Sequence, residues 1–384
     1  MRKIKLRITE IIIVVKYIIA KLYSIFLHKE QLWLISERGF EARDNAYHFF
    51  LYVKQSHPEI NIKYVIDKKS QDYERLKKYE GDIINYGSFK HYLLLCLSTH
   101  LISTHIMGYT PNMGFFYKLD KYLNLFKSQK KIFLQHGIIK DYLPVLFGNN
   151  VRLDLFCCGA KPEFDYVFQN FNHPIGVVQY TGLCRYDKLN DFNTNKQILV
   201  MPTWRTYINK ENLHESAYYK YWKEFLEDKV LHQILAKTNY KLYFYPHYEM
   251  QKHLDLFKQM NLSENIIVAD FKFDVQSLLK ESSLLVTDYS SVYFDFVYMK
   301  KPVIYYQFDE EEFRKYHYQK GYINESIFGV KVSNTKDLVD RLHISIQENC
   351  APSSTYGSVY DDFFPIRDTN NCNRVYTAIK ALDV

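Results

Sequence analysis

Four short groups of polar residues each come directly after an apolar segment whose pattern predicts a buried strand. In open α/β sheets, ligands bind beyond the carboxyl ends of the strands, so these groups are the candidates for a functional site. Imidazoles, hydroxyls, carboxylates and a guanidinium are the side-chain types that suit proton transfer and the binding of phosphate. The groups are His136-Gly137, Thr203-Trp204-Arg205, His247, and Thr287-Asp288-Tyr289-Ser290-Ser291 with Asp295 following.

Each group also has a purely structural alternative. A neutral histidine with a pKa of about 6.5 can accept a proton from a hydroxyl, but His136 could equally be a structural residue of a turn. Ser290 and Ser291 precede a predicted helix, where hydroxyls can bind phosphate together with free backbone N–H groups. The same serines could simply cap that helix.

Several familiar chemistries have no motif in the chain. There is no Gly-rich dinucleotide or P-loop motif, no Gly-x-Ser-x-Gly elbow and no His-x-x-x-His pair. His100 and His105 flank a predicted strand and suggest no metal geometry, so we expect one buried and one surface histidine. The six cysteines form no Cys-x-x-Cys pair, which favours reduced, buried thiols.

The elements that must position these groups alternate between strands and helices, twice over. With 384 residues, 47% of them hydrophobic and 24% charged, the chain is globular and long enough for two domains. Strand–helix alternation favours parallel sheets covered by helices. The predicted strands are 32–36, 62–66, 83–86, 101–104, 132–135 and 155–158, then 198–201, 242–245, 266–268, 284–287 and 303–306. The predicted helices are 46–54, 73–79, 89–97 and 163–171, then 218–226, 253–260, 275–280 and 292–299, with 336–349 and 373–382 near the end.

We therefore expect an α/β protein with two Rossmann-like domains facing a cleft. A polar stretch at 187–196 is the best candidate linker. The expected division is a basic, apolar helix at 1–30, a first domain at 31–187, a second domain at 188–345, and a helical segment at 346–384 that could cross back over the first domain.

The first 30 residues carry a net charge of +5 out of +7 for the whole chain. Lys16 and Lys21 interrupt the apolar run at 11–27, which leaves no stretch near the ~20 residues that a bilayer crossing needs. Basic residues among large apolar ones predict a helix that lies on an anionic membrane surface. The alternatives are an ordinary packed helix and a true span. Because the positive charge is concentrated in this arm, a nucleic-acid role is not expected.

The four groups, in this order, resemble the CDP-glycerol:glycerophosphotransferase family of teichoic acid and capsule biosynthesis. The resemblance covers about residues 31–380, and its most specific part is Thr287-Asp288-Tyr289-Ser290-Ser291 followed by Phe294-Asp295. It implies two Rossmann-like domains in the GT-B arrangement, acting at the inner membrane face. Residues 31–187 would form the acceptor domain, and residues 188–345 would form the CDP-donor domain. It also implies transfer of glycerol phosphate, or another polyol phosphate, from CDP-glycerol or CDP-ribitol to a lipid-linked saccharide or polyol-phosphate polymer, with release of CMP.

The resemblance also implies roles for individual residues. His136 would be the general base. His247, the second catalytic residue, would lie beside the donor diphosphate and would protonate it or donate a hydrogen bond to it. Ser290 and Ser291 would hold phosphate oxygens, and Asp295 would reach a ribose or polyol hydroxyl. The remaining predicted donor-binding residues are Gly137, Arg185, Thr203, Trp204, Arg205, Thr287 and Asp288.

Tyr245-Pro246, rather than a basic residue, precedes His247, which leaves neutralisation of the diphosphate to Arg185, Arg205 and a helix N-terminus. No carboxylate cluster demands a metal, and assistance by a divalent cation stays open. Two other functions remain: a GT-B glycosyltransferase that uses a nucleotide sugar, and a non-catalytic, membrane-bound scaffold of a polymer-assembly complex.

Overall fold

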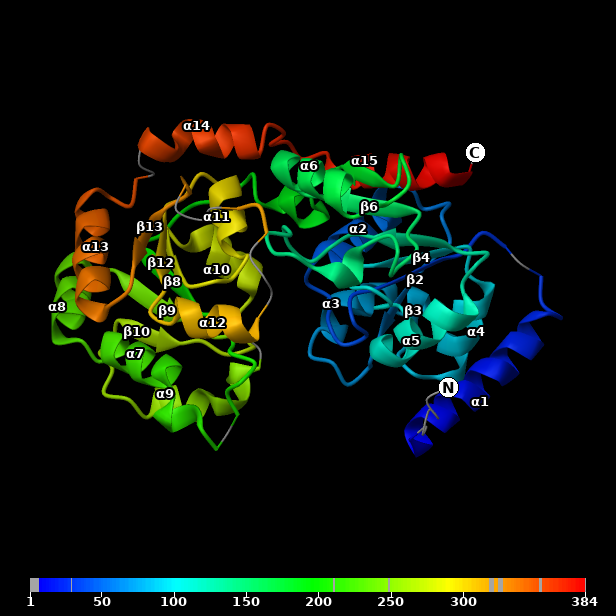
Figure 1. Ribbon diagram of the computed structural model, residues 1–384, viewed down its shortest axis with the longest axis horizontal. Coiled ribbons are helices and arrows are strands. Elements are labelled where there is room, and N and C mark those ends of the chain that lie inside the picture. The colour runs from blue at the N-terminus through cyan, green and yellow to red at the C-terminus, as the bar shows by residue number, and fades with distance from the viewer. Residues whose placement is uncertain are drawn as a thin grey trace. The chain divides into compact units, whose positions relative to one another are not determined.

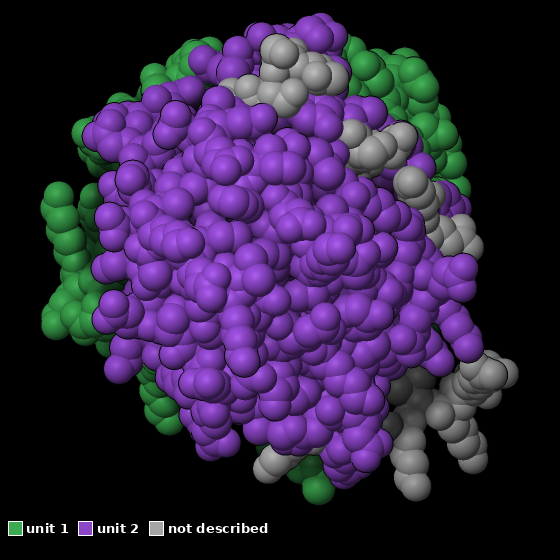
Figure 2. Space-filling view, turned by 90° about the vertical axis from the view of Figure 1, so that its left-hand side faces the viewer, with its two compact units in different colours: residues 1–138, 144–188, 368–384 green, residues 139–143, 189–367 purple. Residues whose placement is uncertain are grey.

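The chain folds into two compact units, which Figure 2 colours separately. The computed structural model describes residues 7–28, 30–209, 211–247, 249–317, 321–323, 327–351 and 354–383. Unit 1 comprises residues 1–138, 144–188 and 368–384, and unit 2 comprises residues 139–143 and 189–367. The first long segment of unit 2 therefore begins inside the polar stretch at 187–196.

Unit 1 is built on a seven-stranded parallel sheet with strand order β3-β2-β1-β4-β5-β6-β7. Its strands are β1 (Trp33–Ser36), β2 (Ile62–Ile66), β3 (Ile83–Asn85), β4 (His100–Ser103), β5 (Lys130–Phe133), β6 (Leu155–Cys158) and β7 (Val178–Tyr180). The strand order reverses between β1 and β4, where Trp33 pairs with His100. In this topology the reversal opens a crevice at the carboxyl ends of the strands.

Helices cover both faces of this sheet (Figure 1). They are α1 (Ile8–Ser24), α2 (Asn45–Ser56), α3 (Tyr73–Leu76), α4 (Phe89–Leu97), α5 (Met113–Leu123), α6 (Lys161–Asn170) and α15 (Asn371–Lys380), with single 3₁₀ turns at η1 (Lys77–Asp82), η2 (Pro144–Leu146), η3 (Cys184–Lys188) and η7 (Ala381–Asp383). Because successive strand residues face opposite sides, Trp33 and Ile35 pack with α2 and α15, whereas Leu34 packs with α4 and α5.

Helix α1 packs against unit 1 with one face only. Ile13, Val14, Tyr17 and Ala20 join the core between α4 and α5, and Tyr17 meets Phe116 edge to face at 5.6 Å. The packed-helix alternative therefore describes this face. Among the described residues, no helix is long and apolar enough to cross a membrane.

Unit 2 repeats the plan with a six-stranded parallel sheet of order β10-β9-β8-β11-β12-β13. Its strands are β8 (Gln197–Met201), β9 (Lys241–Phe244), β10 (Ile266–Val268), β11 (Leu284–Thr287), β12 (Val303–Tyr306) and β13 (Val330–Val332). The order reverses between β8 and β11, where Thr287 pairs with Met201. The predicted site residues Thr203-Trp204-Arg205 follow the end of β8, and Asp288-Tyr289-Ser290-Ser291 follow the end of β11.

The core of unit 2 lies between this sheet and helices on one face, among them α7, α8 and α13, around the buried Trp222. Helices α10 and α11 pack against β8, β11 and β12. The helices are α7 (Ala217–Leu226), α8 (Lys229–Thr238), α9 (Leu254–Lys258), α10 (Val275–Glu281), α11 (Tyr293–Tyr298), α12 (Glu310–Tyr316), α13 (Thr335–Gln347) and α14 (Ser354–Phe363), with 3₁₀ turns at η4 (Leu213–Glu215) and η5 (Met250–His253).

Candidate functional site

His136 follows β5 and stacks on a second histidine, His105, which follows β4. The two ring centroids lie 4.6 Å apart, and the ring planes differ by 14°. Strands β4 and β5 are neighbours in the sheet, so their carboxyl ends bring two residues 31 positions apart into contact. Sequence reasoning missed His105 as a site residue, although its place at a strand end was the available signal.

The two rings differ in exposure, but the pKa of each is lowered. His105 is half-buried, its Nδ1 lies 2.9 Å from the hydroxyl of Thr104, and burial together with nearby His136 and Arg38 lowers its pKa well below the usual value. His136 is exposed, yet loss of surrounding water and the charges of Arg185 and Arg38 lower its pKa as well. Since solvent still reaches the His136 ring, its desolvation is only partial. Both imidazoles are neutral at neutral pH and able to accept a proton.

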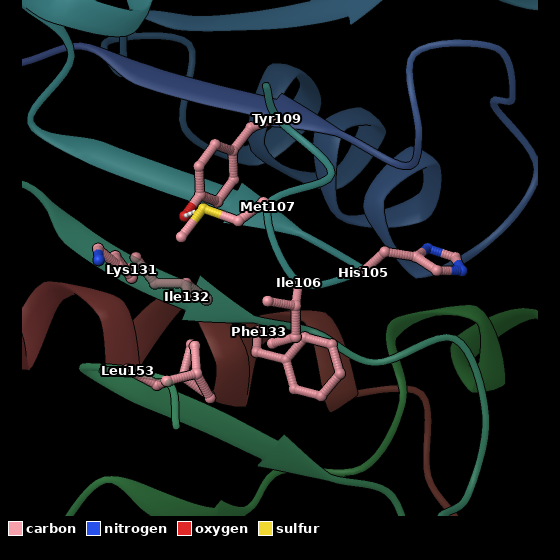
Figure 3. A pocket seen from close by; sticks show the side chains of 9 residues that line it. His105, Ile106, Met107, Tyr109, Lys131, Ile132, Phe133 and Leu153 are labelled. Carbon is pink, nitrogen blue, oxygen red and sulfur yellow. Dashed lines mark hydrogen bonds between the residues drawn. The ribbon is translucent and has the colours of Figure 1, made fainter. Parts of the chain in front are cut away.

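The His105 ring points away from a small apolar cavity that its own loop helps to line (Figure 3). The apolar residues of that lining are Ile106, Met107, Ile132, Phe133, Val151 and Leu153. The His105 ring stacks on His136 instead of entering the cavity.

Glu37 is a buried carboxyl group at the end of β1 that sequence reasoning did not single out. It accepts backbone N–H bonds from Asp44 at 2.7 Å and from Arg43 and Tyr47 at 3.2 Å. Burial and the charges of Asp44 and Glu41 raise its pKa above the usual carboxyl range. Glu37 thereby holds the loop that leads into α2 against the strand end.

Arg185 lies in η3 beside His136, and its Nη1 donates to the His136 carbonyl at 2.9 Å and to Asp44 at 3.0 Å. The structure therefore brings His136 and Arg185 together, although His136 was predicted to act on the acceptor hydroxyl and Arg185 on the donor diphosphate. Gly137 is buried directly after His136. Contact of either residue with a donor stays a prediction.

In unit 2, His247 follows β9 and stacks on Trp204, which follows β8, at a centroid distance of 6.5 Å and an angle of 10°. The backbone N–H of Glu249 donates to His247 Nδ1 at 3.3 Å. A neutral ring that accepts a hydrogen bond at Nδ1 carries its proton on Nε2. In this tautomer the Nε2–H of His247 is a hydrogen-bond donor, and a phosphate oxygen could accept that bond.

Arg205 does not have the geometry expected of a diphosphate ligand. Its guanidinium is fully buried and forms two bonds with Asp309, at 2.8 and 2.9 Å, and one with Asp288 at 2.9 Å. Another bond goes to the carbonyl of Thr203 at 2.7 Å. Two carboxylates already balance this one charge, so Arg205 fixes the loops after β8 and β11 rather than presenting a cation to a ligand.

Asp288 and Thr287 are likewise committed to the protein. Asp288 accepts the backbone N–H bonds of Thr203 at 2.8 Å and Tyr289 at 2.6 Å, and Thr287 donates its hydroxyl to the Met201 carbonyl. The Thr203 hydroxyl differs, because it is buried and has no hydrogen-bond partner within the part of the chain that the structure describes. Of these residues, Thr203 has a polar atom that a ligand could satisfy.

Ser290 and Ser291 lie between β11 and α11, half-exposed, with Asp295 buried in the first turn of α11. The Ser290 hydroxyl accepts the backbone N–H bond of Val292 at 3.3 Å. This is a local bond within the turn before the helix, because the N-cap residue of α11 is Val292 and no side chain caps it. Phosphate binding by the two serines stays a prediction.

A protein-family model matches most of the chain. The model of the CDP-glycerol:poly(glycerophosphate) glycerophosphotransferase family matches residues 18–144 and 167–381. The chain belongs to this family.

Curated relatives of this glycerophosphotransferase family chain come from teichoic acid biosynthesis. It is 34% identical over 377 residues to the minor teichoic acid biosynthesis protein GgaB of Bacillus subtilis, which covers 94% of this chain and 41% of that protein. It is 27% identical to a Bacillus subtilis teichoic acid poly(glycerol phosphate) polymerase over 66% of this chain and 33% of the relative. The chain thus spans less than half the length of these relatives.

Solved structures agree on the fold. The wall teichoic acid polymerase TagF superposes with a TM-score of 0.66 at 17% identity, covering 98% of both chains. A putative UDP-N-acetylglucosamine 2-epimerase from Listeria monocytogenes superposes with a TM-score of 0.57 at 14% identity, covering 92% of this chain and 96% of that one. The chain is therefore α/β with two parallel sheets, GT-B-like as in these proteins.

Within the described residues, no group of three or more His, Cys, Asp or Glu side chains is arranged to hold a metal ion. The groups gathered at the strand ends are instead imidazoles, hydroxyls and arginine-bound carboxylates. Such a set suits positioning and proton transfer around a phosphate.

Proposed function

We propose that the chain transfers a polyol phosphate from CDP-glycerol or CDP-ribitol to an acceptor hydroxyl and releases CMP. The observation that carries the proposal is the stacked pair of neutral imidazoles, His105 and His136, at the strand ends of a chain that belongs to a glycerophosphotransferase family. The acceptor is a lipid-linked saccharide or a polyol-phosphate polymer of teichoic acid or capsule synthesis. GgaB and the teichoic acid polymerases among the relatives support this acceptor class.

In the proposed reaction, the acceptor oxygen attacks the phosphorus that carries the polyol. The new P–O bond forms, the bond to CMP breaks, and His136 takes the hydroxyl proton. General-base assistance of this kind contributes about 10²- to 10⁴-fold. His105 packs against the His136 ring and is the second candidate for proton acceptance, since its own pKa is also lowered.

Unit 2 supplies the donor contacts in this proposal. His247 donates from Nε2 to the diphosphate, the Thr203 hydroxyl and the two serines bind phosphate oxygens, and Trp204 offers an aromatic face. Asp295 reaches a ribose or polyol hydroxyl. Phosphoryl transfer needs positioning and charge stabilisation more than covalent help, which this set of groups provides.

A donor screen tests the proposal. The chain is incubated with CDP-glycerol, CDP-ribitol, UDP-sugars and GDP-sugars, and the melting temperature and nucleotide release are measured. We expect only the CDP-polyols to raise the melting temperature and to yield CMP when acceptor is present. Stabilisation by a nucleotide sugar alone would favour the glycosyltransferase, and absence of nucleotide release with every donor would favour a scaffold.

Two substitutions test the assignment of the base. His136→Ala and His105→Ala are each expected to lower CMP release at least about 10²-fold while donor-dependent stabilisation is retained. His214→Ala is the control, because His214 is an exposed histidine of the 3₁₀ turn η4 in unit 2 whose ring contacts Tyr219. Full turnover of His136→Ala would contradict its role.

A further inference from the structure

The backbone on either side of His136 is held by two side chains from other parts of unit 1. Asn45 Nδ2 donates to the carbonyl of Gln135 at 2.8 Å, and Arg185 Nη1 donates to the carbonyl of His136 at 2.9 Å. These carbonyls belong to the two peptide planes that flank the His136 α-carbon. Because peptide units are planar, fixing both planes fixes the φ and ψ of His136 and hence the direction of its Cα–Cβ bond.

Asn45 and Arg185 are also bound to each other through the Arg185 backbone. Asn45 Oδ1 accepts the backbone N–H bond of Arg185 at 3.0 Å, and Asp44, the residue before Asn45, accepts from Arg185 Nη1 at 3.0 Å. Three segments far apart in sequence, the start of α2, the end of β5 and η3, are thereby closed into one ring of hydrogen bonds. Asn45 is fully buried at its centre.

The residue before His136 has a backbone conformation that needs such support. Gln135 has a φ of +60°, in the left-handed region that residues other than glycine rarely occupy. Its side chain is buried and donates to the Cys157 carbonyl. Non-glycine residues stay in this conformation when the surrounding structure holds them there, and such residues cluster at functional sites.

Only a carboxamide of this length satisfies both ends of the contact at position 45. The Gln135 carbonyl requires a donor, and the Arg185 N–H requires an acceptor. Aspartate offers two acceptors and would place a carboxylate oxygen against the Gln135 carbonyl, whereas alanine offers neither group. The position thus has a chemical requirement beyond its burial.

We propose that Asn45, together with Arg185, positions His136 for proton transfer, so that Asn45 is a positioning residue of this enzyme. The proposal rests on the proposed polyol-phosphate transfer for its kinetic part only. It assigns Arg185 to holding the base rather than to neutralising the diphosphate. Neither residue needs to touch substrate for the effect to appear.

The test compares Asn45→Ala and Asn45→Asp with Asn112→Ala. Asn112 caps α5 by accepting the backbone N–H bond of Phe115, so its loss destabilises unit 1 without touching the ring of hydrogen bonds around His136. Each variant is measured for CMP release, for the donor KM and for melting temperature. A histidine-labelled sample is titrated by NMR, with His136→Gln used to assign the His136 signal.

We expect both Asn45 variants to lower kcat by about 10- to 100-fold while the donor KM changes less than about threefold, because a base displaced by an ångström loses rate rather than donor affinity. The His136 titration should shift in both variants, whereas Asn112→Ala should lower the melting temperature alone. A kcat and a His136 titration that stay at wild-type values, or that change only as much as in Asn112→Ala, would overturn the proposal.

Two further arms keep the result interpretable. If both Asn45 variants fail to fold, Arg185→Met removes the other carbonyl contact, and an unchanged His136 titration in that variant would refute the positioning role. If wild-type protein releases no CMP from any donor, the proposed function fails. The NMR comparison still decides whether Asn45 sets the environment of His136.

Discussion

Arg205 lies at the strand end where its type and spacing placed it, but two carboxylates enclose its guanidinium. Asp309 is 104 residues away in the chain, so nothing in the local pattern revealed that the charge was already balanced. His105 is the opposite case, since its contact with His136 arises only when β4 and β5 pair. The local sequence was enough to predict which residues lie at strand ends. Contacts between residues distant in the sequence determine which of these side chains are held by other parts of the protein and which lie together in a candidate site.

Removing the Arg205 charge should destabilise unit 2 strongly. Arg205→Met leaves Asp288 and Asp309 buried without their cation, and breaking a buried ion pair costs about 3–5 kcal/mol. Urea unfolding measures the loss. Lys331→Met, which breaks the exposed pair with Glu310, is the control and should change the unfolding free energy by less than about 1 kcal/mol. A similar effect from both substitutions would contradict the structural role of Arg205.

The pH dependence of turnover should report the lowered pKa of His136. A general base must be unprotonated to act. Because the pKa of His136 is lowered, its ring stays unprotonated to a more acidic pH than an ordinary histidine. Activity is therefore lost only as the pH falls through the lowered pKa. We expect the acid limb of kcat/KM to have its midpoint below about pH 6.5. Profiles from pH 4.5 to 8 measure it, and a midpoint above about pH 7 would argue against His136 as the free enzyme's base.

At the scale of elements, the buried central strands were predictable because their apolar runs are continuous. The sheets contain two strands that the sequence reasoning did not assign, β7 and β13, each of three residues at a sheet edge. Half-exposed edge strands lack the full apolar run that marks a buried strand. Helix α5, also unassigned, has Gly114 in its first turn and mixed polar and aromatic residues, although Asn112 is a regular N-cap signal.

We predict that the outward face of α1 binds a membrane surface. Ile11, Ile12, Val15, Ile18 and Ile19 are each about half-exposed, and Lys16 and Lys21 lie on the same helix. Together with the basic residues ahead of it, this face would bind an anionic bilayer.

Vesicle sedimentation with anionic lipid checks that binding. The double substitution Ile12→Ser and Ile19→Ser should lower the bound fraction at least about tenfold. Each of these side chains would contribute about 1.5–3 kcal/mol to binding when it is buried in the membrane. Ile175→Ser removes an isoleucine elsewhere in unit 1 that is 94% exposed, and it should leave binding unchanged. Retention of the double variant on vesicles would mean that another surface binds the membrane.

At the scale of the whole molecule, unit 1 depends on the last helix of the chain. Asp187 accepts the first backbone N–H bonds of α15, from Asn371 at 2.7 Å and Cys372 at 2.9 Å. Val375 and Ile379 then enter the core beside α2. Asp187 lies two residues from Arg185, so α15 also supports the turn that contacts His136.

Shortening one core side chain of α15 should therefore weaken unit 1. Ile379→Ala is expected to lower the free energy of unfolding by about 2–5 kcal/mol, since its side chain is fully buried. Ile344→Ala on α13, where the side chain is 42% exposed, is the control and should cost much less. Calorimetry measures both, and equal effects would contradict the docking of α15.

The chain leaves unit 1 after residue 188 and returns to it only at residue 368. During synthesis, every residue of unit 2 is therefore translated before the segment that completes unit 1. The nascent unit 1 must wait through about 180 residues of translation without α15 in its core, and a stop codon directly after residue 367 would leave the sequence of unit 2 complete while exposing apolar core of unit 1.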